Sequence, residues 1–515
     1  MSIVRIQGSR MASPPEDFEE FENDSHGAEM LPVKGRESAT ERRLRLLKQL
    51  GFVIAASMSQ FSLGSNTSWP SPALSDIAVN NSTWLGTDIT LTAAQKDMTG
   101  SLVSLGCLLG AWCVGAVGTR LGRRLCLQFT AIPLLVGSIA LSLSTNVYVM
   151  LGARLLQGFG SGSSSAAGTL YVVEVADTSV RGAMTTVCTL AIVLGGLFVV
   201  GVGCVLHWYH LALVCAIPPI ILLIGTFFLP KSPALLLVRG KRLEAVRTLR
   251  RLRGPYANLQ SEIQMLEMKN SSQTTDWKKI LNRRTAKRLA VVVMLFAFQH
   301  FCGNYVFIVH TARILEKVGA PWDPDMGTVL VTAVRLAGTM VSIFLVDRMG
   351  RRSCLVASHA IASASLVMLG TYVYLAEGAP DENTSFSSLG WVPLLCVVTA
   401  VFGIFLGAHP VPYCLAAEYF PTSIRSQTFS ICYSAAMLFS FLVLQVYSPM
   451  QDALTHPGLY WFYSASSCLA VAFTLIFVEE TKGKNYEEIQ IFTPSACVCP
   501  KVCVAARKLL SELMF

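Results

Sequence analysis

The polar residues best placed to act on a small molecule lie inside long apolar stretches. Arg335 falls within VTAVRLAGTMVSIFLV, and Gln299 and His300 fall within LFAFQHFCGNYVF. Side chains of these types donate and accept hydrogen bonds from hydroxyl and carboxylate oxygens. The sequence has no phosphate-binding loop, no recognisable catalytic triad and no metal-ligand spacing. It therefore favours binding without bond making, and we expect no enzymatic activity, no cofactor and no metal.

A second set of charged residues repeats along the chain. Tyr171–Gly182 (YVVEVADTSVRG) is echoed by Leu415–Ser426 (LAAEYFPTSIRS), and Thr119–Arg124 (TRLGRR) is echoed by Asp347–Arg352 (DRMGRR). In the longer pair, each copy carries a glutamate followed seven residues later by an arginine: Glu174 and Arg181, then Glu418 and Arg425. Two echoes in the same order predict a chain built from two similar halves.

The composition places the chain among membrane proteins. Of its 515 residues, 52% are hydrophobic and only 14% are charged, and the mean hydropathy is +0.51. The net charge of +9 is explained by Lys and Arg gathered in cytoplasmic loops, so we expect no nucleic-acid partner. The fifteen cysteines are scattered singly, which is typical of small buried side chains rather than a disulfide framework.

Twelve apolar runs are long enough to cross a bilayer. They lie near residues 50–67, 98–117, 125–144, 147–169, 184–203, 210–229, 289–311, 326–346, 354–376, 391–413, 428–447 and 459–478. We expect Trp69-Pro70-Ser71-Pro72 to end the first run. Between the sixth and seventh runs the chain is strongly basic (KRLEAVRTLRRLRG), which predicts short amphipathic helices on a cytosolic surface.

These runs define the predicted domains. We expect a disordered cytosolic tail over 1–45, a six-helix bundle over 46–230, a helical linker over 231–288, a second six-helix bundle over 289–480 and a cytosolic tail over 481–515. With both termini inside, all the basic motifs are cytoplasmic, as the distribution of Lys and Arg requires. The glycosylation sequons at Asn81 and Asn383 then both fall outside, in agreement with this topology, and we expect the protein in the plasma membrane.

The motifs together resemble those of the sugar porters of the major facilitator superfamily, and within it the facilitative hexose and insect trehalose-type transporters. The resemblance covers about residues 45–485. Besides the echoed segments it rests on Arg154-x3-Gly158, Pro230-x-Ser232-Pro233, Pro410-x-Pro412 and Glu480-Thr481-Lys482-Gly483. It implies an all-α membrane protein whose twelve helices form two six-helix bundles, a monomeric unit that works by alternating access around a central sugar site.

Charged residues at the cytoplasmic helix ends are the expected gate. Acid and base recurring at matched spacing predict pairs that form across the two bundles in one state and separate in the other. The predicted network consists of Arg154, Glu174, Arg181, Asp347, Arg348, Glu418 and Arg425. The alternative is that these residues only anchor the topology.

The resemblance also implies the substrate-binding residues. In the seventh run Gln299 fits the family pattern, His300 replaces a second glutamine, and Tyr305 takes the place of an asparagine, with Asn304 one position early. One residue on a continuous helix is about 100° of rotation, so Asn304 need not face the sugar. The remaining positions are Thr189, Tyr413 and Asn66, and proton-driven members carry an aspartate where this chain has Asn66, which favours passive transport.

Arg335 departs most from the family, which commonly has a neutral asparagine there. It lies twelve residues before Asp347, hence about 18 Å along a helix and near the middle of the bilayer. An arginine at that depth is costly and so is a functional candidate, unless backbone carbonyls or cavity water satisfy it. Three functions stay open: a facilitative carrier of a hexose or trehalose-like sugar, a carrier of a sugar acid or another organic anion, and a non-transporting nutrient sensor.

Overall fold

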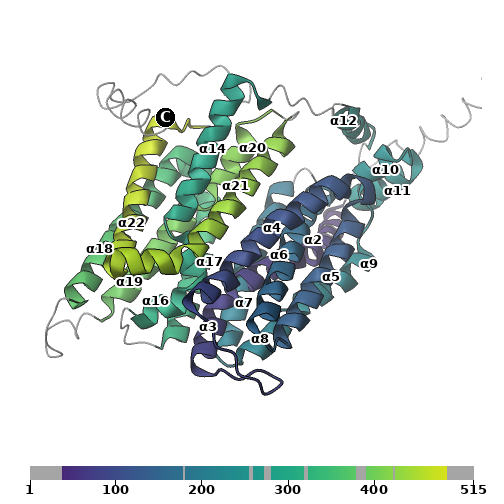
Figure 1. The fold of residues 1–515 in the computed structure, drawn as a ribbon. Helices are drawn as coiled ribbons and strands as arrows, with labels where there is room; N and C mark the ends of the chain where they lie inside the picture. The colour runs from purple at the N-terminus through teal and green to yellow at the C-terminus, as the bar shows by residue number, and fades with distance from the viewer. Residues whose placement is uncertain are drawn as a thin grey trace, which may run out of the picture. The chain divides into compact units, whose positions relative to one another are not determined.

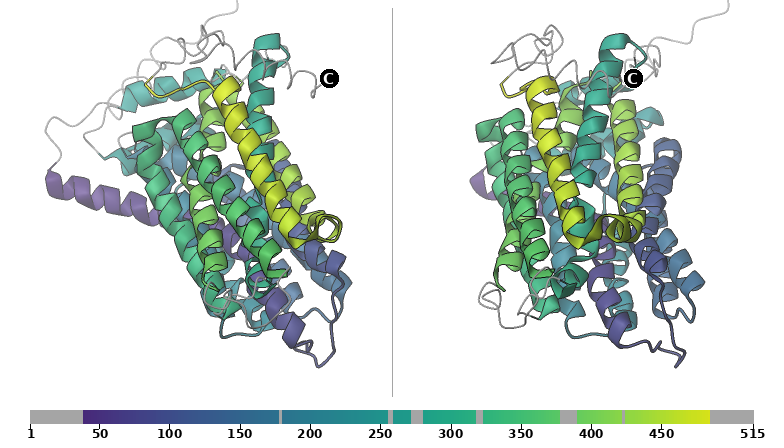
Figure 2. Two further views of the ribbon diagram at one scale, coloured as in Figure 1. Left: turned by 90° about the vertical axis from the view of Figure 1, so that its left-hand side faces the viewer. Right: turned by 60° about the vertical axis from the view of Figure 1, so that its left-hand side comes forward.

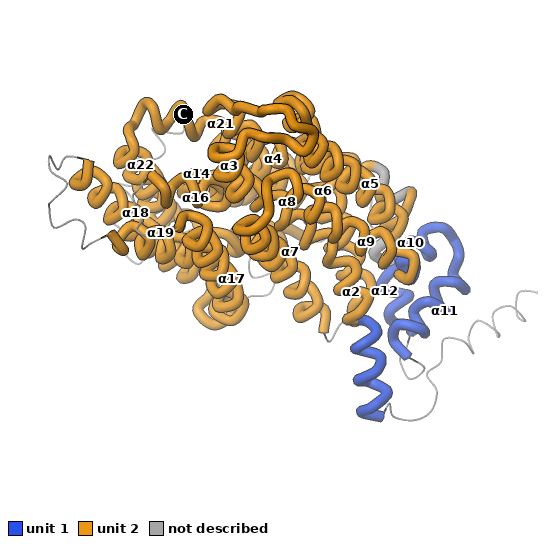
Figure 3. Tube along the Cα trace, turned by 90° about the horizontal axis from the view of Figure 1, so that it is seen from below, with its two compact units in different colours: residues 1–49, 230–273 blue, residues 50–229, 274–515 orange. Residues whose placement is uncertain are grey.

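The computed structural model describes residues 38–177, 180–254, 259–271, 280–317, 323–377, 390–421 and 424–483. The chain divides into two compact units (Figure 3). Unit 1 combines the chain up to Gln49 with Pro230–Gln273, and unit 2 combines Leu50–Leu229 with the chain from Thr274 onward. Asn383 and the two chain ends fall outside the described residues.

Unit 1 contains the expected basic helices of the linker. They are α10 (Pro233–Val238), α11 (Arg242–Arg253) and α12 (Leu259–Ser271), together with the first turns of α2 (Ala39–Ser68). Their small core consists of Val246, Leu249, Leu259 and Ile263. The Gln49 amide donates to the carbonyl of Leu252 at 2.7 Å and so joins α2 to α11. The outer face is charged, and a hydrogen bond from Lys241 lowers the pKa of the exposed Glu244 carboxyl.

Unit 2 is helical throughout its described residues, apart from turns and one isolated bridge between Ser82 and Asp88. Its first half holds the rest of α2 and then α3 (Pro70–Val79), α4 (Ala93–Leu121), α5 (Arg123–Ser142), α6 (Val147–Val175), α7 (Arg181–Gly203), α8 (Trp208–Val214) and α9 (Ile217–Phe228). Its second half holds α14 (Arg283–Phe301), α15 (Asn304–Val309), α16 (Thr311–Lys317), α17 (Pro324–Met349), α18 (Arg351–Glu377), α19 (Val392–Gly403), the π-helix η2 (Ile404–Ala408), α20 (Val411–Glu418), α21 (Arg425–Gln445) and α22 (Tyr447–Phe477). The purple-to-blue helices of the first half and the teal-to-yellow helices of the second form two neighbouring groups in Figure 1.

The expected twelve crossings are present in unit 2. Ten helical segments are both long and apolar enough to span a membrane. The two expected crossings outside that set are α2 and α6, which have 30 and 29 residues and so exceed the length that a bilayer needs. Their serines, glycines and charged residues lower their hydropathy, and 10 + 2 gives the twelve predicted segments.

The first and last crossings end and begin close to the predicted positions. α2 ends at Ser68, directly before the predicted Trp69–Pro72 boundary, and Trp69 keeps helical dihedral angles where the chain continues into α3. Pro70 lies in the first turn of α3, where a missing N–H costs nothing. α22 is kinked at Thr455, which has a φ of 64°, so its second arm begins close to the predicted 459. The short arm before the kink, which the sequence did not predict, turns away from the direction of the second arm in Figure 2.

Glycines set the distance between α4 and α6. Gly106 and Gly110 on α4 face Gly158 and Gly162 on α6, each pair four residues apart. A Cβ added at Gly162 would lie 2.1 Å from the carbonyl oxygen of Cys107 on α4. Backbones approach this closely only across small residues, which is the usual way that helices associate in lipid. The same contact positions Arg154, which lies one turn before Gly158.

We predict that Gly162→Ala lowers the stability of the protein by about 1–3 kcal/mol, because the new methyl group must push the two helices apart. The measurement is thermal unfolding of the detergent-solubilised chain. Gly152→Ala on the same helix is the control, since a Cβ there meets no atom within 4 Å. Equal unfolding temperatures for the two variants would contradict this packing.

Candidate functional site

Arg154 organises the polar interior of the first half. Its side chain is fully buried and donates from Nε to the carbonyl of Thr99 at 2.9 Å and from NH2 to the carbonyl of Asn66 at 2.8 Å. NH1 donates to Oε1 of Gln157 at 2.8 Å, and the guanidinium lies 5.0 Å from the Trp69 ring centroid. No acidic side chain among the described residues pairs with it. Carbonyl oxygens and a ring face therefore satisfy this cation.

A break between α14 and α15 shapes the second half of the site. Gly303 has a φ of 85°, and the helix stops at Phe301 and restarts at Asn304. The family-based expectation that Asn304 need not face the site assumed a continuous helix. In the structure Asn304 is buried and lines a cavity, whereas Tyr305 stacks on the His300 ring with centroids 5.2 Å apart. The left-handed glycine therefore redirects the asparagine toward the interior.

His409 connects the amides of this region. Its Nδ1 lies 2.8 Å from the amide nitrogen of Gln299 and 3.2 Å from that of Asn304. Both amides donate, so Nδ1 is the acceptor and the ring proton is on Nε2. His409 directly follows the π-helix η2, and its ring lies 4.7 Å from that of Phe405. The extra residue in a π-turn rotates the following side chain, a feature that is frequent at functional sites.

Arg335 lies where the two halves of unit 2 meet. Its side chain is only 6% exposed, and its guanidinium lies 5.0 Å from the Phe405 ring centroid. A Cβ added at Gly196 on α7 would lie 3.6 Å from its NH1 atom and 2.6 Å from the Ser68 hydroxyl. Its Nε atom has no hydrogen-bond partner, and no carboxylate pairs with it among the residues that the structure describes. Arg335 is therefore a buried cation with unused donors.

These residues border a small cavity between the two halves. Ser68 from α2 and Asn304, Phe405 and Arg335 from the second half are among its lining residues. The space is about 10 Å³, roughly what one water molecule needs. Three polar atoms of its lining residues have no partner: Oδ1 of Asn304, Oγ of Ser68 and Nε of Arg335. Gln299, which shares His409 with Asn304, also has an unpartnered Oε1. Since buried polar atoms are normally paired, these groups can take up hydrogen bonds from a guest or from water.

The other predicted binding residues take different places. Asn66 is buried beside Arg154 and donates to the Ser161 hydroxyl at 3.1 Å. Tyr413 packs edge-on against Phe296 and lies 6.0 Å from the His409 ring, so it borders the cluster. Thr189 is exposed on α7 and is not among the residues that line the cavity. The sequence offered His409 only as a possible further donor, outside the predicted set, because a lone histidine in a helix is usually packed and the π-turn that aims it was not predicted.

The predicted gate residues other than Arg154 lie toward one end of unit 2, which we call the charged end. Glu174 and Arg123 form an ion pair at 3.2 Å, and Glu418 and Arg351 form one at 3.0 Å. Each of these pairs lies within one half of the unit, whereas the sequence predicted pairs across the two halves. The direct partners are the first arginines of the two GRR motifs, which the predicted network did not include. The sequence carried a signal for these pairs, since the GRR motif and the glutamate recur together in both halves.

The two halves repeat these contacts. Gly122 and Gly350 have φ values of 90° and 92° and each separates two helices at a sharp turn. Arg124 donates to the carbonyl of Phe227 at 3.0 Å, and Arg352 donates to that of Leu475 at 2.5 Å. The internal repeat in the sequence therefore encodes a repeated structure.

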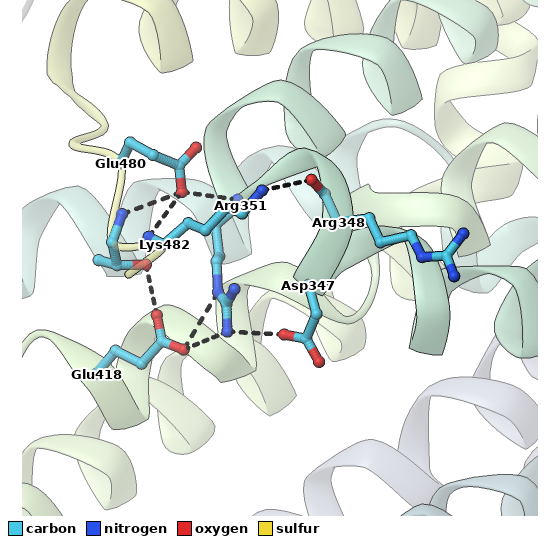
Figure 4. A network of polar contacts seen from close by, with 7 residues as sticks. Asp347, Arg348, Arg351, Glu418, Glu480 and Lys482 are labelled. Atoms are coloured by element: carbon cyan, nitrogen blue, oxygen red, sulfur yellow. Dashed lines mark hydrogen bonds and ion pairs between the residues drawn. The ribbon is translucent and has the colours of Figure 1, made fainter. Parts of the chain in front are cut away.

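Glu480 completes the cluster in the second half (Figure 4). Its carboxylate accepts from the backbone N–H groups of Arg351 at 2.9 Å and Arg352 at 3.1 Å, which begin α18. A negative charge at a helix N-terminus stabilises it, because the first N–H groups have no partner within the helix. Glu418 also accepts from the hydroxyl of Thr481 at 2.5 Å. Residues that follow the last crossing thereby hold α18 and α20 together.

The remaining network residues are less connected. Asp347 lies 3.1 Å from NH2 of Arg351, while the side chain of Arg348 points away from the cluster in Figure 4. Arg425 donates to the carbonyl of Phe420 at 3.2 Å, and Nε of Arg181 has no partner. Arg154 lies near the opposite end of α6 from Glu174 and belongs to neither charge cluster, because its donors are used by the carbonyls described above. Asn81 is exposed in the turn before α4.

We predict that Glu418→Gln destabilises the protein by about 1–2 kcal/mol, since Arg351 and Thr481 lose a charged acceptor that is only partly exposed. Thermal unfolding of the purified chain measures this. Glu244→Gln is the matched control, because its ion pair with Lys241 is exposed to solvent and contributes little to stability. The idea fails if the control variant loses as much stability as Glu418→Gln.

Comparisons with known proteins place this architecture. A family model described as "Sugar (and other) transporter" matches residues 52–492. The facilitated trehalose transporter Tret1 of Apis mellifera ligustica is 29% identical over 452 residues, which are 87% of this chain and 88% of that protein. Tret1 of Drosophila yakuba is 29% identical over 443 residues, or 85% of this chain, and the match spans only 51% of its length.

A solved structure shares the fold. The xylose transporter XylE from E. coli, in an inward-open conformation, matches with a TM-score of 0.70 and 22% identity, covering 85% of this chain and 98% of that one. At this identity the likeness shows the arrangement of the helices alone. Because the family model spans most of the chain, the protein belongs to the sugar (and other) transporter family, and it has the twelve-helix fold of the major facilitator superfamily.

Proposed function

We propose that this protein is a facilitative carrier of a neutral sugar, of hexose or trehalose-like type, which works by alternating access. The cluster of Gln299, Asn304, His409 and Arg335 carries the proposal. It lies where the two halves meet, at the level where the helix α14–α15 is interrupted, and it holds several unpartnered donors and acceptors. Interrupted helices at the interface of repeated halves are the usual binding places of such carriers.

The donor and acceptor types fit sugar hydroxyls. Amide oxygens accept from a hydroxyl, while Arg335 and the Nε2–H of His409 donate to its oxygen. The cavity is too small for a sugar in this conformation, so binding requires Arg335 or the helices around Phe405 and Asn304 to move apart. Alternating access supplies such a movement in this fold. The solute is carried without any bond being made or broken.

Passive transport is supported by the surroundings of Asn66. This residue occupies the place where proton-driven relatives have an aspartate, and its carbonyl accepts from Arg154 at 2.8 Å. The amide cannot take up a proton, so the position next to the buried arginine carries no titrating carboxylate. We infer that sugar moves down its own gradient.

We also propose the orientation of the protein in the membrane and the parts that move. With the charged end facing the cytoplasm, Asn81 at the other end of α4 faces outward, where it is open to glycosylation. The helices before Pro230 and after Arg283 then act as the two moving six-helix bundles, in a monomeric carrier of the plasma membrane. The pairs Arg123–Glu174 and Arg351–Glu418 keep each bundle rigid at the cytoplasmic end while the bundles separate.

Uptake into reconstituted vesicles tests the function. Labelled glucose, trehalose and a sugar acid are supplied side by side, with and without a pH gradient. We expect a neutral sugar to equilibrate at a rate and to a level that the gradient does not change. Selective movement of the sugar acid, accumulation driven by the gradient, or movement of no solute would each overturn the proposal.

We predict that Arg335→Ala reduces sugar uptake about tenfold or more, because a charged donor to a buried hydroxyl is worth about 1.5–3 kcal/mol. Arg242→Ala in unit 1 is the control, since that side chain is exposed and lies on the outer face of α11. Initial rates at several sugar concentrations give the measurement. Unchanged uptake of every solute by the Arg335→Ala carrier would show that this arginine has no role in binding.

A further inference from the structure

A buried carboxylate joins the two halves at the end of unit 2 opposite the charged end. Asp97, in the second turn of α4, is fully buried. Its Oδ2 accepts from the backbone N–H of Ser448 at 2.9 Å, and Ser448 lies in the first turn of α22. A residue of the first half therefore caps a helix of the second half, where a negative charge is most favourable.

An imidazole faces the same carboxylate. Nε2 of His310 lies 3.7 Å from Oδ1 of Asp97, and both side chains are completely shielded from solvent. Neither ring nitrogen of His310 has a hydrogen-bond partner, and neither does Oδ1 of Asp97. The His310 ring stacks on Tyr447 with centroids 4.5 Å apart and planes 10° apart. The site thus holds a carboxylate oxygen and an imidazole nitrogen that face each other and have no hydrogen-bond partner.

Charged groups on neighbouring helices surround this carboxylate–imidazole pair. Arg313 on α16 lies over the Tyr447 ring at 5.7 Å and acts electrostatically on both Asp97 and His310. Asp452, on the first arm of α22, opposes it. Two phenols on α22, Tyr447 and Tyr463, are close enough to interact electrostatically with Asp97. The N–H of Ser448 and the Arg313 cation both attract a negative charge at this position.

We propose that Asp97 and His310 form a proton-binding site that latches the two halves together at this end and releases them when it takes up a further proton. Its ligand is the hydrogen ion, bound by the carboxylate–imidazole pair.

The charge on Asp97 determines whether the two halves stay closed at this end. While the carboxylate is ionised, it holds the Ser448 N–H and is stabilised by Arg313, so closure is favoured. A proton on Asp97 removes the charge that both groups face, and a proton on His310 adds a buried cation beside Arg313. Either one weakens the contact across the halves. Acidification therefore promotes opening at this end, and the rate of carrier cycling becomes dependent on pH without any proton being driven across.

A second carboxylate–imidazole pair, Asp76 and His207, does not link the two halves. Asp76 accepts from the backbone N–H of Trp208, the first residue of α8, at 2.7 Å, and it lies 3.3 Å from Nδ1 of His207. The chemistry is the same, but all three residues belong to the first half, and His207 is about half exposed. Asp76→Asn is therefore a control that removes a carboxylate–imidazole cap without touching the junction between the halves.

The test measures how readily the two halves separate at this end, and it does not depend on which solute is carried. Ser101, one turn beyond Asp97 on α4, is buried and donates to Oε1 of Gln445 across the halves at 2.9 Å. Ser101→Cys places a thiol there, and the full-length chain in lipid vesicles is labelled with a maleimide. The same chain without this change gives the background from the native cysteines. Adding D97N should speed labelling about tenfold at neutral pH, because a charged acceptor is lost, whereas adding D76N should not change it.

Acid should act in the same direction as D97N. At each pH, the labelling rate of the form with Asp97 is divided by that of the D97N form, which corrects for the effect of pH on the thiol itself. This ratio should rise as the pH falls. Equal labelling with and without D97N, or the same change on adding D76N, would overturn the latch. Should D97N fail to fold, Ser448→Pro replaces it, because proline removes the N–H that Asp97 accepts from, and unchanged labelling there would count equally against the proposal. A failure of sugar uptake leaves this result unaffected, so the two proposals are distinguishable.

Discussion

Two arginines without a carboxylate partner in the described chain are the constraint on which the interior of unit 2 depends. A buried cation must be compensated, and here the compensation differs between the two. Arg154 is satisfied by two backbone carbonyls, a glutamine and an indole ring, and it joins α2, α4 and α6 into one rigid group. Arg335 has a ring face and an unpaired Nε atom. One arginine is therefore structural, and the other keeps hydrogen-bonding capacity for something that enters.

The close approach of α4 and α6 makes the first arrangement possible. Glycine on both helices lets Arg154 reach the carbonyl of Thr99, which a wider separation would place out of range. At the charged end, the repeated GRR motifs turn the chain sharply and tie each glutamate within its own half. Between the halves, α4 packs against α21 and α7 against α17, and several hydrogen bonds cross, of which the Asp97–Ser448 bond is one.

The sequence predicted the architecture well because its signals are long and periodic. Twelve apolar runs and two repeated charge motifs led to twelve crossings and two similar halves, and the family comparison agrees. It predicted Gln299 and Arg335 as interior residues because polar groups inside apolar runs must face the protein. It could not place Asn304, since the break at Gly303 changes the direction of every later side chain. Nor could it find Asp97, which stands just before an apolar run and is buried against His310 and the start of α22, both from the second half of the chain.

The central claim is that the cluster around Arg335 is where a sugar binds. A cryo-electron microscopy structure of the chain with saturating sugar tests it most directly. Our account predicts sugar density between the two halves, in contact with Arg335 and with the amides of Gln299 and Asn304, and a cavity enlarged by separation of the helices that now close it. Density at another place, or an unchanged cavity under conditions where the sugar is transported, would contradict the account.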